Sequence, residues 1–450
     1  MQGLDERVLR DILERAVGSE RASAALEAFS LPPSVSIRLN PFKLPSPKGL
    51  RGSDASLRSA PPLASLRSAP VPPLVPRVAL SSPPEPFGEE AEPVRVPWSP
   101  YGYMLPERPR FILDPLFHAG CYYVQDSSAM VVGHIVREHL DLFKDLGRPV
   151  RVLDLCAAPG GKTTDIAASL RERFGDGFLL VATEVMRSRA SVLCDNVAVW
   201  GDPNVTVTCC DPKAVGRLEG FFDMIVADVP CSGEGMFRKD AKAVEDWSPD
   251  AVSLCASRQR RILADAWPAL RQGGILVYST CTFEEAENDA NVEWVAAELG
   301  ADVLGYDYSS LPGVLATRTG GLLVPGFVEG EGQFVAAVAK TSRPAVSHAG
   351  PESLHPLRNG LVKGTVKGRA LVPSSDWALS IFPPLDSYPA VGLDRETALR
   401  YLRRESIFVE GQPEGFLVVT YEGHPLGFVK NIGKRWNNLH PLNRRIRMEI

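Results

Sequence analysis

Three stretches of this sequence combine a short apolar run with residues that can bind a ligand or react. They are RVLDLCAAPGGKTTD (Arg151–Asp165), DMIVADVPCSGEGMFRK (Asp223–Lys239) and GGILVYSTCTFEEAEND (Gly273–Asp289). Each pattern predicts a buried strand that ends in a polar turn. The second turn carries Cys231 and the third carries Cys281. A thiolate is a nucleophile, so both cysteines are candidates for covalent catalysis, and the alternative is that they pack as small apolar side chains.

The first stretch has the pattern of a ligand-binding turn. Arg151–Cys156 is apolar enough for a strand that is covered on both faces. Gly160 and Gly161 let the backbone approach a ligand without a Cβ in the way. Thr163–Leu170 is predicted to be helical, with free N–H groups above the turn. Strand, glycine turn and helix at the carboxyl edge of a sheet form the place where open α/β folds bind nucleotides.

Two familiar motifs are excluded at this turn. The letters GGKT resemble the end of a phosphate-binding loop, but that motif needs glycine where Cys156 stands. The turn does not match GxGxxG either, which makes dinucleotide binding a weak interpretation. Taken alone, it could be an ordinary tight turn between a strand and a helix. The two downstream stretches favour a functional interpretation.

The blocks LDLCAAPGGKT, DVPCSGEG and YSTCT resemble, in order and spacing, the RNA (cytosine-5) methyltransferases of the Fmu/Sun/NSUN type. The resemblance extends over nearly the whole chain and is nearest to the bacterial small-subunit rRNA methyltransferases with a C-terminal RNA-binding extension. It implies an α/β fold, with a Rossmann-like S-adenosylmethionine methyltransferase sheet, an α+β N-terminal domain and a small PUA-like C-terminal module. It also implies rRNA, or the small ribosomal subunit, as the partner.

The resemblance assigns catalytic roles to four residues. Cytosine C5 becomes nucleophilic when a thiolate adds to C6 while N3 is protonated or hydrogen-bonded. The family implies that Cys281 attacks and that Cys231 assists release of the product, whereas DNA cytosine methyltransferases attack with the cysteine at the Cys231 position. Asp228 would form a hydrogen bond to N3. Lys162 would lie near the site and lower the pKa of a cysteine.

The same resemblance assigns the cofactor site. The amino-acid end of S-adenosylmethionine would lie against Cys156, Ala157, Ala158, Pro159, Gly160, Gly161 and Lys162. Glu184 would bind the ribose hydroxyls, Arg189 matches a family position, Asp211 would lie near the adenine, and Asp228 would also border the cofactor. For Glu184 the alternative is a charge that caps a helix. The segment Tyr123–Asp126 would border the cofactor and substrate pocket. Ordinary packing is the favoured interpretation for the neighbouring Tyr122 and an open alternative for Gln125 and Asp126.

The charge of the chain is uneven. The 450 residues carry a net charge of −5, but Lys340–Ile450 holds 16 Lys and Arg against 10 Asp and Glu, a net of +6. The first 339 residues therefore carry −11. A basic C-terminal region after an acidic main part fits an enzyme whose C-terminal extension binds the phosphates of a nucleic acid. The alternative is that these charges only form a solvated surface.

Cysteine usage and hydropathy indicate a cytoplasmic protein. The eight cysteines include no CxxC pair and no cluster with zinc spacing, so we expect no metal and a reducing compartment. No apolar run approaches the roughly 18 residues of a membrane span, and the N-terminus is charged. We also expect a monomer.

Composition and periodicity predict four parts. Residues 1–105 are predicted to form an α+β domain, which the resemblance implies to be RRM-like and which opens with one or two helices in Leu4–Phe29. It contains a flexible proline-rich insertion at Leu50–Arg77, with the repeat ASLRSAP. Residues 106–340 form the catalytic domain, 341–375 a basic linker or small subdomain, and 376–450 the PUA-like domain. Alternating strands and helices predict a mostly parallel catalytic sheet with helices on both faces.

The end of the chain carries the predicted RNA contacts. Phosphate contacts are expected from basic side chains and base stacking from one tryptophan: Lys430, Lys434, Arg435, Trp436, Arg444, Arg445 and Arg447. The function that the sequence favours is C5 methylation of cytosine in small-subunit rRNA. The alternatives are a tRNA (cytosine-5) methyltransferase and a non-catalytic ribosome assembly or RNA-binding factor, and the presence of both cysteines argues against a protein substrate.

Overall fold

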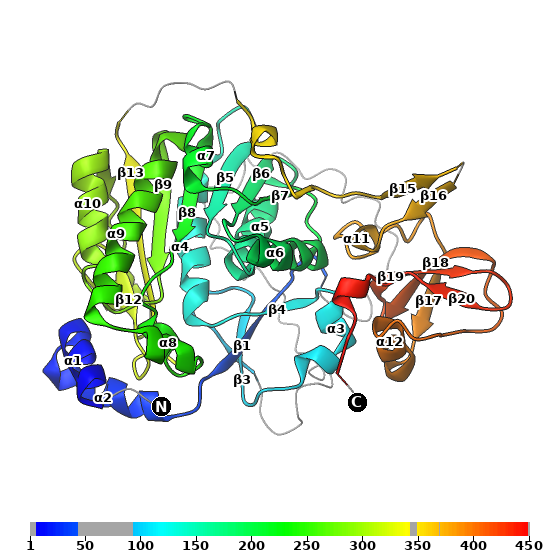
Figure 1. Ribbon diagram of the computed structural model, residues 1–450, viewed down its shortest axis with the longest axis horizontal. Helices are drawn as coiled ribbons and strands as arrows, with labels where there is room; N and C mark the ends of the chain where they lie inside the picture. The colour runs from blue at the N-terminus through cyan, green and yellow to red at the C-terminus, as the bar shows by residue number, and fades with distance from the viewer. Residues whose placement is uncertain (1–5, 44–92, 343–348, 369, 449–450) are drawn as a thin grey trace, which may run out of the picture.

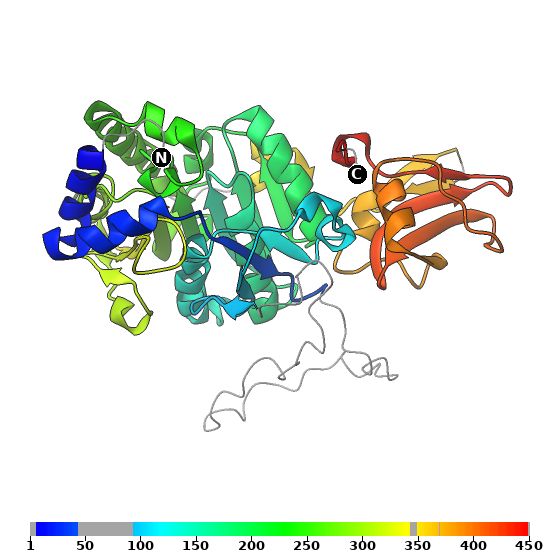
Figure 2. The same ribbon diagram turned by 90° about the horizontal axis from the view of Figure 1, so that it is seen from below.

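The computed structural model describes residues 6–43, 93–342, 349–368 and 370–448. The proposed insertion Leu50–Arg77 lies outside these residues. A central α/β unit has two N-terminal helices at one end and a small C-terminal module at the other (Figures 1 and 2). Of the described helices, none has the length and apolar character that crossing a membrane requires.

The central sheet has ten strands, and its middle is parallel. The parallel strands, in spatial order, are β9 (Leu270–Thr280), β8 (Phe222–Asp228), β5 (Val150–Leu155), β6 (Phe178–Thr183) and β7 (Val205–Thr208). The flanking strands are antiparallel: β10 (Ala301–Val303), β11 (Leu315–Ala316), β12 (Gly321–Leu323) and β13 (Gln333–Lys340) beyond β9, and β14 (Arg358–Asn359) beyond β7. The prediction of a mostly parallel sheet is therefore right for the centre and wrong for the edges. Short connections join β11, β12 and β13, and a parallel crossover needs a longer one.

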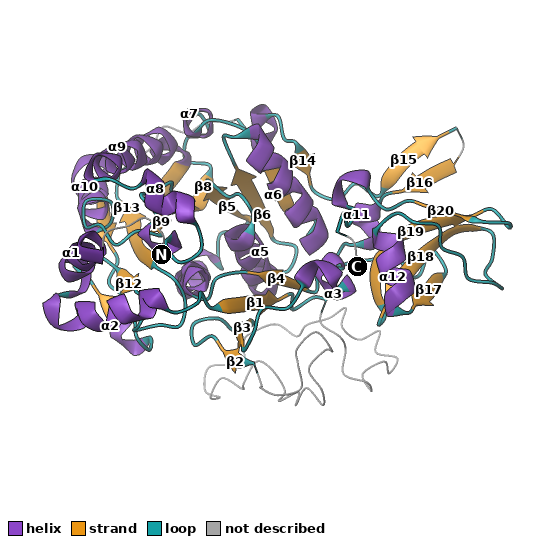
Figure 3. Ribbon diagram, turned by 60° about the horizontal axis from the view of Figure 1, so that its bottom comes forward, coloured by secondary structure: helices purple, strands orange, loops and turns teal. Residues whose placement is uncertain are grey.

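Alternation along the strands builds a core on each face of this sheet. Val152 and Leu180 pack on one face, and their neighbours Leu153 and Val181 pack on the other. The first face is covered by α4 (Val131–His139), α5 (Gly161–Phe174) and α6 (Arg187–Trp200). The second is covered by α7 (Pro212–Gly216), α9 (Pro249–Ala266) and α10 (Asp289–Leu299), with α8 (Ala241–Asp246) nearby (Figure 3). The strands reach the same carboxyl edge, where the three motifs end.

The N-terminal part is divided between two places. Helices α1 (Glu6–Val17) and α2 (Ser19–Ser30) pack into the second core, where the ring of Phe29 lies 6.1 Å from that of Phe283. A separate antiparallel sheet has the order β2 (Val94–Arg95), β3 (Gly102–Leu105), β1 (Val35–Leu39) and β4 (Tyr122–Val124). Its fourth strand comes from beyond residue 105, where we placed the end of the N-terminal domain.

The C-terminal module is a four-stranded sheet with helices. Its strands are β17 (Ala390–Leu393), β18 (Gly415–Tyr421), β19 (His424–Asn431) and β20 (Trp436–Asn438), and its helices are α11 (Ser375–Ala378) and α12 (Arg395–Leu402). A two-stranded ribbon, β15 (Gly364–Lys367) and β16 (Ala370–Pro373), precedes it. Its core continues into α3 (Pro115–His118) and β4, because Leu402 packs in one cluster with Leu116 and Tyr122. The module is therefore docked on the catalytic part by apolar contacts.

Candidate active site

The turn after β5 forms a tight loop at the start of α5. Cys156 adopts a left-handed backbone with φ 63°, and Gly160, at the N-cap of α5, has φ 114°. At Gly160 a Cβ would meet Leu193 at 3.1 Å, so both the backbone conformation and the space favour glycine. The hydroxyl of Thr163 donates to Asp154 at 2.5 Å, which ties the helix back to the strand. We call Cys156–Lys162 the cofactor loop.

Buried acids surround the cofactor loop. Asp154 is fully buried, and burial raises its pKa to about 7. Glu184, directly after β6, is 2% exposed, and its Oε1 accepts a hydrogen bond from the Met186 amide. Its Oε2 lies 3.2 Å from Arg189 Nη1 but accepts no hydrogen bond from any residue that the structure describes. Arg189 also donates to the Ala158 carbonyl at 2.8 Å, so the acid, the arginine and the loop form one cluster.

Asp211 is not brought into this cluster by any described contact. It is exposed, and its Oδ1 accepts a hydrogen bond from the Lys213 amide at the N-cap of α7. Helix capping accounts for this aspartate, and its role near an adenine stays a prediction.

Cys231 and Cys281 meet at the carboxyl edge of the sheet. They follow the neighbouring parallel strands β8 and β9, and their sulfur atoms lie 3.3 Å apart as free thiols. The hydrogen bond with Cys281, followed by burial, raises the pKa of Cys231 well above its usual value. The carbonyl of Cys281 accepts a hydrogen bond from the Gly235 amide at 2.8 Å, which fixes one cysteine turn against the other.

A charged pair lies beside the two thiols. Lys162 Nζ donates to Asp228 Oδ2 at 2.8 Å, and the Ser279 hydroxyl donates to Asp228 Oδ1 at 2.7 Å. Burial lowers the pKa of Lys162, but Asp228 and, more weakly, Cys281 raise it, and the result is a raised pKa. Lys162 therefore keeps its positive charge within electrostatic reach of Cys281.

A buried acidic cluster that we did not foresee lies under the cysteine turns. The hydroxyl of Ser232 contacts the carboxylates of Glu234 and Glu287, and Gln259 donates to Glu287 at 2.6 Å. Both glutamates are fully buried, and burial raises the pKa of Glu287 to about 7. The sequence signal was present in the blocks PCSGEG and EEAEND, which place acids a few residues after each cysteine.

The raised pKa of Glu287 predicts a pH dependence of stability. Between about pH 4.3, the ordinary value for glutamate, and pH 7, the folded protein holds a proton here that the unfolded chain releases. Stability should therefore fall as pH rises through this window, by on the order of 3 kcal/mol from this group. In Glu287→Gln the fall should be smaller, with the remainder due to groups such as Asp154. Urea unfolding from pH 5 to 8 measures this, with the exposed Glu298→Gln as control, and equal slopes in wild type and Glu287→Gln would contradict the interpretation.

The segment Tyr123–Asp126 borders the cofactor loop through Tyr123 and Gln125, whose side chains both lie against Gly161. The hydroxyl of Tyr123 donates to the Pro159 carbonyl at 3.3 Å. Gln125 accepts a hydrogen bond from Arg38, while Asp126 pairs with Lys239 at 2.6 Å, so both of these side chains have structural partners.

Arg38, which sequence reasoning missed, joins the small sheet to the start of α5. Its fully buried guanidinium donates to Thr164 Oγ1 at 2.5 Å and to the Gly161 carbonyl at 3.1 Å. The signal was an arginine inside the alternating strand SVSIRLN. A side chain on β1 thereby holds the first turn of the helix that follows the cofactor loop.

The predicted RNA-binding residues differ in accessibility. Five of them are exposed on the C-terminal module: Lys430, Lys434, Arg435, Arg445 and Arg447. Arg444 is instead bound to Asp195 at 2.9 Å and Asp376 at 2.7 Å. Trp436 is 3% exposed and packs against Phe408, so the expectation that it stacks a base needs correction, because the apolar core of the module covers its ring.

Comparisons with known proteins agree with this architecture. Residues 146–337 match the family model of the 16S rRNA methyltransferase RsmB/F, and residues 388–446 match the methyltransferase RsmF PUA domain. The chain is 30% identical over 421 residues to the ribosomal RNA small subunit methyltransferase F of Klebsiella pneumoniae, across 79% of this chain and 85% of that protein. It is 31% identical to the protein of that name from Cronobacter sakazakii, with the same coverage.

Solved structures share the fold. A methyltransferase homolog protein from Pyrococcus horikoshii aligns with a TM-score of 0.54 and 24% identity, over 75% of this chain and 96% of that one. NSun6 from the same organism, in a structure with SFG, aligns with a TM-score of 0.53 and 19% identity, over 74% and 98%. With motifs, central sheet and C-terminal module all in agreement, the chain belongs to the ribosomal RNA small subunit methyltransferase F family, whose members are rRNA methyltransferases.

Proposed function

We propose that this protein methylates C5 of a cytosine in small-subunit rRNA with S-adenosylmethionine, through a covalent bond between Cys281 and C6. The observation that carries the proposal is the 3.3 Å approach of Cys231 and Cys281 beside the Lys162–Asp228 pair. A site with two free thiols and a charged pair at the end of parallel strands has the groups that this chemistry needs.

The residues around the cofactor loop fit S-adenosylmethionine. Oε2 of Glu184 is buried without a hydrogen-bond donor among the described residues, as expected of an acceptor reserved for a ribose hydroxyl. Gly160 keeps the backbone open where a side chain would meet α6. When bound, S-adenosylmethionine supplies the methyl group. The role of the protein is to hold that methyl group in line with C5.

In the first step Cys281 acts as the nucleophile. Its thiol gives its proton to the Asp228 carboxylate, its sulfur forms a bond to C6, and the electrons of the C5–C6 double bond make C5 electron-rich. Asp228 passes a proton to N3 of the base in the same step, so the net transfer is from the thiol to N3. Asp228, which accepts hydrogen bonds from Lys162 and Ser279, acts as the acid–base partner of N3, and the charge of Lys162 stabilises the Cys281 thiolate.

In the last step C5, now methylated, must lose its proton. The C6–S bond then breaks, the C5–C6 double bond returns, Cys281 recovers its thiolate and N3 releases its proton. Cys231 assists this step: its sulfur lies 3.3 Å from that of Cys281, next to the reacting carbons, and as a thiolate it takes the C5 proton, while Asp228 takes the proton from N3.

Bisulfite sequencing tests the proposed function directly. Small-subunit rRNA and tRNA are compared from cells with the gene, without it, and with the Cys281→Ala form. We expect one or more protected cytosines in small-subunit rRNA that lose protection without the wild-type protein. Protection lost only in tRNA would favour a tRNA methyltransferase, and no loss anywhere would favour a non-catalytic factor.

Glu184 provides a test of the cofactor site alone. Glu184→Gln should weaken S-adenosylmethionine binding roughly tenfold, because an amide is a poorer acceptor for ribose hydroxyls than a carboxylate. Isothermal titration calorimetry of the folded protein measures this without any RNA. Glu298→Gln, an exposed change of the same type, should leave the affinity unchanged. Equal affinities of wild type and Glu184→Gln would remove Glu184 from the site.

A further inference from the structure

A cavity of about 390 Å³ lies between the catalytic part and the C-terminal module. Its walls come from α6, from the segment that includes α3 and β4, and from residues near the end of the chain. Its volume falls within the roughly 300–1,000 Å³ of small-molecule pockets, which often form at the interface of two domains. No part of the proposed catalytic mechanism uses it.

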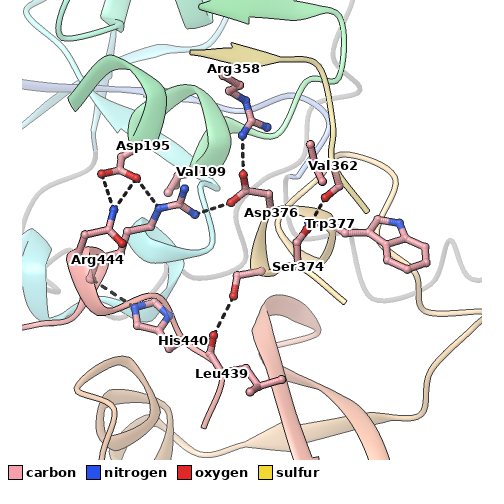
Figure 4. Close-up of polar contacts among 12 residues, drawn as sticks. Asp195, Val199, Arg358, Val362, Ser374, Asp376, Trp377, Leu439, His440 and Arg444 are labelled. Carbon is pink, nitrogen blue, oxygen red and sulfur yellow. Dashed lines mark hydrogen bonds and ion pairs between the residues drawn. The ribbon is translucent and has the colours of Figure 1, made fainter. Parts of the chain in front are cut away.

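Ion pairs hold the walls of this cavity together (Figure 4). Asp195 on α6 accepts hydrogen bonds from Arg444 at 2.9 Å and from Asn443 at 2.9 and 3.0 Å. Arg444 also donates to Asp376 at 2.7 Å, and Asp376 in turn pairs with Arg358 of β14. These ion pairs and hydrogen bonds fix the C-terminal module against α6, so the walls of the cavity are already in place before a ligand binds. Binding therefore does not carry the entropic cost of ordering them.

The charges at the cavity disfavour a phosphate group as its occupant. Among the described residues that line the cavity, Arg444 is the cation, and Asp195 and Asp376 pair with it. Asp376 also pairs with Arg358, so these four charges balance and an anion would meet no uncompensated positive charge. The carboxylate of Asp195 would accept hydrogen bonds from amino or imino groups. His440 is 4% exposed, and burial lowers its pKa to about 4, so it is neutral near pH 7. The polar groups of the cavity therefore suit an uncharged, planar ligand with N–H donors.

Aromatic side chains supply the remaining surface. Tyr123, Phe117 and His118 line the cavity and are each partly exposed, and the rings of Phe117 and His118 lie 5.4 Å apart. Partly exposed rings beside hydrogen-bonding groups are the surfaces on which proteins stack single-stranded RNA bases.

The cavity shares two side chains with the cofactor loop. Asn196 Nδ2 donates to the Pro159 carbonyl at 2.7 Å, and the Tyr123 hydroxyl donates to the same oxygen at 3.3 Å. Both residues also line the cavity. A ligand in the cavity would thus lie against the outer side of the loop that we assign to the cofactor.

We propose that this cavity holds an unstacked base of the substrate RNA, other than the cytosine that is methylated. The inference rests on the proposed function and specifies how the RNA is held. Arg445, the exposed neighbour of Arg444, can meet the RNA backbone outside the cavity while the base enters it. Binding of a second base would fix the position of the RNA relative to the catalytic cysteines.

Filling the cavity tests this inference. Val192 lies on α6 in the cavity wall and is 49% exposed, so Val192→Trp adds bulk there without disturbing a core residue. The matched control is Val303→Trp, which changes an exposed valine in the same way. Val303 lies on β10, which pairs with β13 on the other side of the sheet from β7. Methylation is followed on unmethylated small-subunit rRNA. We expect Val192→Trp to raise the KM for RNA about tenfold, with S-adenosylmethionine affinity unchanged, and Val303→Trp to match wild type.

Photocrosslinking gives a second measurement on the unaltered protein. RNA that contains 4-thiouridine is irradiated with wild-type protein, and the linked peptides are identified by mass spectrometry. We expect links within residues 112–124 or α6, besides those near the cysteines. Links confined to the cysteine turns and the exposed basic residues, or equal KM values for the two tryptophan variants, would overturn the cavity as a base-binding site. A wild-type protein that methylates no RNA would instead overturn the proposed function, and this inference with it.

Discussion

Cys281→Ala should lower methylation of small-subunit rRNA by at least about a thousandfold, because removal of a catalytic nucleophile costs orders of magnitude in rate. Affinity for S-adenosylmethionine should stay within about twofold. The thiol is assigned to the base and not to the cofactor, whose loop is held by separate contacts such as that of Arg189 with Ala158. Single-turnover methylation measures the first effect and calorimetry the second.

A matched cysteine separates this effect from a general sensitivity to thiol loss. Cys209 also follows a parallel strand, β7, at this sheet edge, is half-buried, and donates to the Val185 carbonyl, not to either catalytic cysteine. Cys209→Ala should therefore retain near-normal turnover. Substantial activity in Cys281→Ala would remove Cys281 as the nucleophile, whatever the control shows.

The parallel centre of the fold could be predicted because its strands are apolar on both faces. The apolar run Gln333–Lys340 and the helical pattern Arg187–Trp200 in the sequence predict strand β13 and helix α6 at their observed bounds. An apolar strand carries no sign of its direction, however, so the sequence could not show that β13 runs antiparallel to β9. Direction depends on the connection, and the short strands β11 and β12 gave too weak a pattern to reveal it.

The parts of the site that follow strand ends were predictable, and those that depend on packing between distant segments were not. Cys231 and Cys281 meet because parallel neighbours β8 and β9 end at one edge. Arg38 reaches α5 only because the small sheet docks there; an arginine inside an alternating strand is unusual, but it does not reveal which distant element the side chain contacts. Trp436 sits in a basic segment, which suggested exposure, but it belongs to the module's core. Local charge is a poor guide to the burial of a single aromatic residue.

Cys231→Ser should accumulate a protein–RNA adduct that survives denaturation. If Cys281 attacks and Cys231 assists release, the variant still forms the S–C6 bond but resolves it slowly. A serine hydroxyl is a far weaker acid than a thiol and is therefore rarely ionised. The ionised side chain that would remove the C5 proton is thus almost absent in Cys231→Ser. Denaturing gel electrophoresis after incubation with RNA and S-adenosylmethionine detects the adduct as a band of reduced mobility.

The double variant orders the two steps. Cys231→Ser combined with Cys281→Ala should form no adduct and should behave like Cys281→Ala, because release does not matter when attack never occurs. When two residues act one after the other on the same intermediate, loss of the first is expected to hide the effect of losing the second. The 3.3 Å between the two sulfur atoms makes the comparison necessary, since either thiol is close enough to be the nucleophile. An adduct from Cys281→Ala but not from Cys231→Ser would reverse the roles, and methyl transfer with no adduct from any form would show that the reaction does not proceed through a covalent enzyme–RNA bond.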